Sequence, residues 1–184
     1  MSFTLAGKTA SDLGVRLKSG YQEPVSPNIR KRELTIPGKA GKINCGDEYD
    51  VRTFELPLVT VNTTTKAGVQ DVIRQLIDEL TNNPGEPREV SLSFDKEPNL
   101  HYGVKLNQSS PVDRHPAHFA EFALNLVATQ PYALGDEETV TATITDSPQD
   151  IAVENDGNVE TPVNITITNE GDNTISDFTL KTKE

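Results

Sequence analysis

Residues 34–41 read Leu-Thr-Ile-Pro-Gly-Lys-Ala-Gly, and the segments that follow this stretch decide the fold. An alternating segment, Tyr49–Val59, comes next, then one amphipathic segment at 69–80, a pair of alternating segments at 90–106 and a last one at 119–132. This order predicts one helix among many strands. It brings no nucleophile beside a base and gathers no metal ligands, so it indicates a part of an assembly rather than an enzyme.

The helix has the clearest pattern. Its apolar residues recur at i, i+3, i+4, i+7, i+8 and i+11, which is one continuous stripe; they are Val69, Val72, Ile73, Leu76, Ile77 and Leu80. Thr64 or Thr65 supplies an N-cap, and residues 82–85 (Asn-Asn-Pro-Gly) end the helix. A single helix with one apolar stripe must cover a sheet or the end of a sandwich.

Strands are predicted before the helix. Phe3–Leu5, Val15–Leu17 and Glu33–Ile36 are short, and Glu48–Val59 is long. The apolar residues of the long strand change parity near residues 52–53, which predicts a β-bulge there. Pro57 predicts that this end of the strand lies at a sheet edge, because proline cannot donate to a ladder.

After the helix, Val90–Phe94 and Tyr102–Leu106 alternate in polarity and are joined by residues 95–99, so they predict an antiparallel hairpin. The segment 119–132 is apolar on both faces, which predicts a central strand or one that meets a neighbour.

Composition supports a mainly β (α+β) fold. Apolar residues make up 34% of the 184 residues, aromatic residues only 5%, and there is no Trp, which indicates the thin aliphatic core of a β-sandwich. We expect an N-terminal sandwich with the helix and a protruding arm over residues 1–134, and a short acidic β domain over residues 135–184. The second domain should contain four short strands: Val140–Ile144, Ile151–Val153, Val163–Ile167 and Phe178–Leu180.

Charge divides the chain at the same place. Residues 1–134 carry 15 Lys and Arg against 16 Asp and Glu, a net charge of −1, whereas residues 135–184 carry 2 against 12, a net charge of −10. A phosphate-binding surface needs clustered Lys and Arg, so the second domain would repel nucleic acid. It is better suited to be a solvated tail or an acidic docking surface.

Residues 20–32 depart from the strand pattern. Pro24 and Pro27 exclude a central strand, so we expect an arm or a long loop. Residues 30–32 are Arg-Lys-Arg, a basic run without interleaved aromatics; we expect it to contact an acidic neighbour, which could be another copy of the chain. The loop at 37–42 contains two glycines, one or both of which should adopt positive φ.

Other chemistry is weakly indicated. The loop Gly38–Lys42 lacks the upstream Gly and the following Ser or Thr of a phosphate-binding loop. His115 and His118 lack a third metal ligand nearby, and Cys45 is the only cysteine, so no disulfide can form within the chain. We therefore expect no catalytic residue, no metal and no cofactor. The sequence shows no signal peptide and no apolar stretch of membrane-spanning length, so synthesis in a cytoplasm without export is expected.

The ordered set of segments over residues 1–168 resembles the distal tail protein family of long-tailed (siphovirus-type) bacteriophages. The matching pieces are Phe3, Leu13–Val15, Ile36–Gly38 with Gly41, the single helix, the hairpin at 90–106 and the strand that ends in Pro131-Tyr132. Residues 155–157 and 162–165 are similar to the opening of the family's galectin-like sandwich. Lys39-Ala40 stand where the family often has Arg-Asp, and the second domain is short, so it is expected to be partial or reduced.

The resemblance implies a closed ring, usually a hexamer, at the tip of the virion tail, assembled in the cytoplasm of the bacterial host. The ring would join the tail-tube protein to a tail-tip lysin or adhesion protein, contact the tape-measure protein, and leave a channel for DNA without sequence-specific binding. The residues expected at the interface between copies lie in the arm and the following loop: Pro24, Pro27, Arg30, Lys31, Arg32, Pro37, Gly38, Lys39, Gly41 and Lys42. A tail-tube subunit and a carbohydrate-binding module of the adhesion device are the alternatives.

Overall fold

The structure, a computed structural model, describes residues 2–181 except 84, 109, 117, 156, 160, 162 and 176. The chain divides into two compact units, Met1–Glu138 and Thr139–Glu184, which we describe separately.

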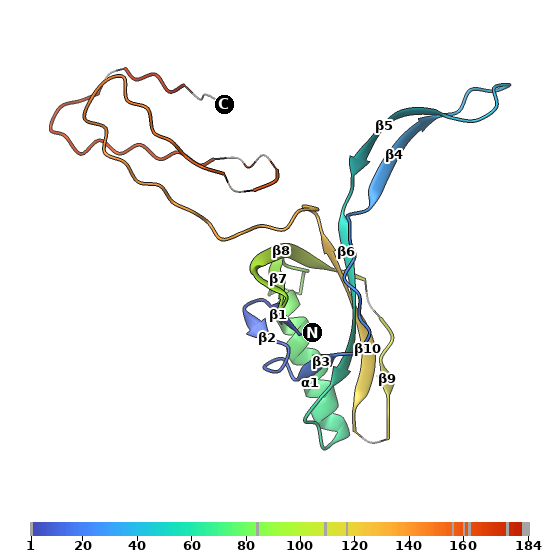
Figure 1. Cartoon of the computed structure of the whole chain (residues 1–184). Coiled ribbons are helices and arrows are strands. Elements are labelled where there is room, and N and C mark those ends of the chain that lie inside the picture. The colour runs from blue at the N-terminus through green and yellow to red at the C-terminus, as the bar shows by residue number, and fades with distance from the viewer. Residues whose placement is uncertain are drawn as a thin grey trace. The chain divides into compact units, whose positions relative to one another are not determined.

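The first unit is built on a curled antiparallel sheet (Figure 1). Within the described residues the sheet has eight strands, in the order β2-β1-β7-β8-β10-β6-β3, with β9 paired to β10. These are β1 (Phe3–Leu5), β2 (Lys8–Thr9), β3 (Val15–Leu17), β6 (Arg52–Thr60), β7 (Val90–Phe94), β8 (Glu97–Gln108), β9 (Asp113–Arg114) and β10 (Ala120–Ala128). The mainly β fold with one helix, α1 (Lys66–Leu80), is confirmed.

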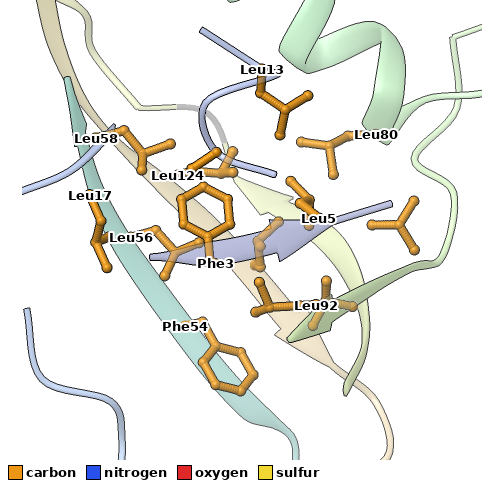
Figure 2. Packing of buried hydrophobic residues seen from close by; sticks show 14 of the residues in the cluster. Phe3, Leu5, Leu13, Leu17, Phe54, Leu56, Leu58, Leu80, Leu92 and Leu124 are labelled. Carbon is orange, nitrogen blue, oxygen red and sulfur yellow. The ribbon is translucent and has the colours of Figure 1, made fainter. Parts of the chain in front are cut away.

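The core lies on the inner face of the curled sheet, where alternate residues of each strand meet (Figure 2). Phe54 and Leu56 of β6 pair in register with Leu126 and Leu124 of β10, and all four side chains are buried. Phe3 lies beside them. The core is largely aliphatic, as the composition predicts.

Thr65 is the N-cap of helix α1: its Oγ1 accepts a hydrogen bond from the N–H of Gly68, and the helix runs from Lys66 to Leu80. Val69, Leu76 and Leu80 are buried, so the predicted stripe is confirmed at its centre. Its flank is different, because Ile77 is 37% exposed.

The predicted long strand Glu48–Val59 is wrong. The chain breaks at residues 50–51 into β5 (Ile43–Tyr49) and β6, which belong to different sheets. The change of parity near residues 52–53 therefore marks the junction of two strands rather than a bulge.

The expected edge at Pro57 needs a related correction. Strand β6 pairs with β10 along one side and with β3 along the other, but β3 covers only Leu58–Thr60. Pro57 lies where this cover ends, and its carbonyl accepts the N–H of Lys18 at 2.8 Å. On the side away from β10, the part of β6 that no strand pairs with is therefore its N-terminal half, Arg52–Leu56.

Other predicted boundaries differ less from those of the structure. Residues 20–32 are not entirely a loop, because β4 (Ile29–Leu34) begins within them. The 90–106 hairpin is confirmed, but its connection is the two-residue turn Asp95-Lys96 rather than 95–99, since β8 begins at Glu97. Strand β10 lies between β6 and β8, so the central position predicted for this segment is confirmed.

In the second unit the four predicted strands are wrong: the described residues of 139–181 contain neither helix nor strand. Their apolar side chains are exposed, including Ile144 at 61% and Phe178 at 71%. Alternating apolar residues need an opposing apolar layer to form a sandwich, and the described part of this unit supplies none. Whether the segment opens a galectin-like domain stays a prediction.

Candidate interaction site

Strands β4 and β5 form a two-stranded antiparallel sheet of their own, which extends away from the body of the first unit (Figure 1). The register runs from Ile29 opposite Tyr49 to Leu34 opposite Ile43. All residues of both strands are exposed. We call residues 29–49 the arm.

The arm carries apolar side chains near its tip. Leu34 is 53% exposed, Ile36 is 40% exposed, and Ile43, opposite Leu34, is 36% exposed. We call these three residues the tip cluster. A two-stranded hairpin is only marginally stable in water, so an arm that exposes apolar pairs is suited to be covered by another surface.

The loop at the end of the arm contains Gly38 and Gly41, both with φ of 83°. The N–H of Lys39 donates to the carbonyl of Ile36 at 3.1 Å, which closes a turn. The prediction of positive φ is therefore confirmed at both glycines. The fold thus brings two parts of the expected interface, residues 30–32 and residues 37–42, onto one hairpin.

Ion pairs run across the arm. Arg30 pairs with Asp50 at 2.8 Å, Arg32 pairs with Glu48 at 2.8 Å, and Lys42 pairs with Glu33. The backbone N–H of Val51, and then the Arg30 guanidinium, hold the pKa of Asp50 below its usual value.

These pairs bear on the expectation for the basic run. Arg30 and Arg32 have acidic partners on the opposite side of the same hairpin, and contact of the run with another copy stays a prediction. Lys31 and Lys39 form no ion pair with the described residues, so they are the basic side chains that a partner could meet.

Pro24 and Pro27 lie on the segment that leads to the arm, residues 19–27, which we call the strap. At one end, Lys18 donates to the carbonyl of Pro57; at the other, the N–H of Asn28 donates to the carbonyl of Val51 at 3.2 Å. Between these two hydrogen bonds the chain advances ten residues from Lys18 to Asn28, but only six from Val51 to Pro57. The strap is too long to pair with β6, and it arches away.

The arch leaves the edge of β6 unpaired. Backbone groups alternate in direction along a strand, so those of Thr53 and Glu55 point to the same side as the carbonyl of Pro57. A groove of about 640 Å³ lies there, lined by strap residues, by residues 53–55 and 57 of β6, and by residues 107–108 of β8 and 125–126 of β10. We call Arg52–Leu56 the open edge.

Arg52 pins the strap to the body. Its guanidinium donates to the carbonyl of Pro24, and its Cζ lies 4.9 Å from the ring centroid of Tyr102 and 5.8 Å from that of Phe54. Sequence reasoning missed this residue, because Pro24 and Tyr102 lie 28 and 50 positions away from it and no local pattern indicates these contacts.

The remaining candidates gain no chemistry from the fold. The ring of His115 stacks on Phe119 with centroids 4.3 Å apart, and Cys45 is exposed on the arm. Among the described residues no three His, Cys, Asp or Glu side chains gather closely enough to hold a metal ion. Nor is any described helix both long and apolar enough to cross a membrane.

Comparison with known families and solved structures finds similarity to phage proteins. The family model for the phage tail protein RIFT-related domain matches residues 8–128, a range that holds the helix, the arm and the described strands of the large sheet other than β1. Among solved structures, the chain is similar to SPP1 Dit (gp 19.1) protein, described as a paradigm of the hub adsorption apparatus in phages that infect Gram-positive bacteria.

The TM-score of that match is 0.54 at 19% sequence identity, over 73% of this chain and 52% of the other. The likeness therefore concerns the fold, and this chain spans about half the length of the solved protein. None of the curated proteins compared with the chain matches it.

Proposed function

The chain belongs to the family of the phage tail protein RIFT-related domain, and from this premise we propose that copies of it close into a ring at the tail tip. The ring, which we expect to be a hexamer, would join the end of the tail tube to the host-adhesion tip. DNA would pass through its channel. A structural role in the phage tail is what the family match and the Dit-like fold support.

The observation that carries this proposal is the arm. It holds two strands in solvent, with an apolar pair, Leu34 and Ile43, exposed near its end. A ring needs a heterologous interface, in which one surface of a subunit meets a different surface of the next. The arm supplies one such surface.

The open edge supplies a second. An unpaired strand is a template for a strand of another chain. The arm and the open edge are different surfaces of the same unit, as a head-to-tail contact requires. The strap lies between them, so Pro24 and Pro27 would lie near the interface as well.

Charge is compatible with passage of DNA. Residues 1–134, which hold the sheet, the helix and the arm, are close to neutral, with a net charge of −1. Binding by release of counterions needs many Lys and Arg contacts to phosphates, which such a surface does not supply. The proposed neighbours are the tail-tube protein, the tape-measure protein and a tail-tip lysin or adhesion protein.

Negative-stain electron microscopy of the purified chain tests the proposal. We expect discrete rings with rotational symmetry. Ile36→Asp, in the tip cluster, should abolish them; Ile144→Asp, the same change at a more exposed isoleucine of the second unit (61% against 40%), should not. Stacked filaments would favour the alternative of a tail-tube subunit, and isolated particles under all conditions would contradict the ring.

A further inference from the structure

We propose that Arg52 is the positioning residue of the arm: its guanidinium clamps the strap against the body and so fixes the direction in which the arm leaves it. The clamp is a property of a single chain. Only its consequence for assembly rests on the proposed function.

Arg52 stands at the joint between arm and body. At the base of the arm, the carbonyl of Asn28 accepts a hydrogen bond from the N–H of Asp50 at 2.7 Å, and the N–H of Asn28 donates to the carbonyl of Val51. The backbone pairing of the hairpin therefore continues to residue 51. The next residue, Arg52, is the first of β6 and pairs with Ala128 of the body. The chain therefore passes from one sheet to the other at this residue.

The aromatic rings under the Arg52 guanidinium are buried in the core. Tyr102 and Phe54, over which the guanidinium lies, are 6% and 1% exposed, and their ring centroids are 5.0 Å apart. A cation over aromatic faces is attracted by their quadrupoles, more strongly where water is excluded. Because the rings belong to the core, the position of the guanidinium is set by the body.

The strap has few other attachments. Between Lys18 and Asn28, the one hydrogen bond that any described residue makes to it is the bond from Arg52 to the carbonyl of Pro24. Tyr21 adds a stacked contact on Phe94, with centroids 6.0 Å apart. Arg52 thus holds the half of the strap nearer the arm, and Tyr21 holds the half nearer β3.

Arg52 also acts on a charged group of the strap. Burial raises the pKa of Glu23 on the strap, and the charge of Glu97 acts in the same direction, while Arg52 and Lys96 oppose the rise. Arg52 is therefore a counter-charge for a carboxylate of the segment that it holds. Its planar fork serves the stack and the carbonyl together, which a lysine ammonium cannot do equally well.

One other contact lies at the base of the arm. Tyr49 meets Tyr132 edge to face, with centroids 6.1 Å apart, but the two side chains are 57% and 41% exposed. A contact so exposed to water restrains the arm less than the half-buried clamp, which lies on buried rings. With Arg52 removed, we expect the arm to turn about residues 50–51.

A ring closes only if each interface repeats the same rotation. A clamped arm presents its tip cluster at one angle to the next copy, whereas a free arm would present it at many. Loss of the clamp should therefore give open or irregular oligomers of a folded chain.

The test uses Cys45, the chain's single cysteine, which is exposed on the arm. A spin label there and a second at Gln75→Cys, on the exposed side of α1, report the distance from arm to body by pulsed dipolar spectroscopy. Labelled chains are diluted into unlabelled ones, so that distances within one chain are read. We expect one narrow distance distribution in the parent protein and its loss in Arg52→Ala.

Three further variants complete the design. Arg16→Ala, an exposed arginine on β3, should leave the distribution narrow. Arg52→Lys keeps the charge and the stem, and so preserves the fold if the alanine variant does not form; it should broaden the distribution to a lesser degree. Tyr132→Ala should broaden it less than Arg52→Ala.

A distribution in folded Arg52→Ala or in Arg52→Lys as narrow as the parent's would overturn the clamp. Broadening by Tyr132→Ala alone would transfer the role to the tyrosine pair. The ring is judged separately by microscopy, so a narrow parental distribution without rings would leave the clamp standing and remove the proposed function.

Discussion

Leu34 of β4 lies directly opposite Ile43 of β5 near the tip of the arm, and both side chains are exposed to solvent. In the eight-stranded sheet, by contrast, the in-register pair Phe54 and Leu126 is buried. The exposed pair therefore departs from the usual burial of paired apolar side chains in a folded domain.

Leu34→Asp should dissociate the assembly while leaving the chain folded. A cross-strand pair contributes about 0.2–1 kcal/mol, so the free energy of unfolding should fall by no more than about 1 kcal/mol. Sedimentation velocity and chemical denaturation measure the two effects. If the variant assembles like the parent, the tip cluster is not part of the interface.

Gly14→Ala should destabilise the first unit more than Gly7→Ala does. Both glycines have positive φ, 67° and 77°, where an L-residue costs about 1–2 kcal/mol. A Cβ on Gly14 would also lie 3.0 Å from Cγ2 of Val72 on α1, whereas one on Gly7 would meet open space. Equal losses in thermal or urea unfolding would mean that α1 does not press on this turn.

Thr65→Ala should cost about 1 kcal/mol of stability, because it removes the oxygen that caps α1. Thr64→Ala is its matched control and should be close to neutral. The pair decides between the two caps that the sequence permits. A larger loss in Thr64→Ala would move the start of the helix.

Glu23→Gln should stabilise the chain at pH 7, since burial raises the pKa of Glu23. Between the ordinary and the raised pKa the folded state holds the extra proton, so stability of the parent falls as pH rises through that window and then stays level. The gain should vanish below about pH 4, under the ordinary pKa of glutamate.

Glu33→Gln should behave in the opposite way. Its bond to Lys42 lowers the pKa of Glu33, so its contribution is present at neutral pH and is lost as pH falls through the lowered pKa. Unfolding curves of the parent and both variants from pH 3 to pH 8 test the two signs. Two variants with the same sign would show that the local environment of one carboxylate is misassigned.

The elements that sequence patterns predicted well are those with one buried face. Helix α1 and the hairpin β7–β8 have regular apolar periods because each lays one face on the core. The arm has no buried face, so its boundaries could not be read from alternation. Only residues 50 and 51 separate β5 from β6, so two strands of different sheets have the pattern of one.

Errors elsewhere have a different cause. The second unit has the alternation of strands at Val140–Ile144 and Val163–Ile167, but alternation states only which residues would face a layer, not that the layer exists. The clamp joins Arg52 to Pro24 and Tyr102, contacts that depend on the finished fold. Such long-range pairs leave no trace in local periodicity.

The most direct test of the ring is the mass of the intact chain in solution, measured by native mass spectrometry or mass photometry over a range of concentrations. The account predicts one dominant species at about six times the 20.1 kDa of a single chain. A single species of one chain at every concentration, even with neighbouring tail proteins added, would contradict it.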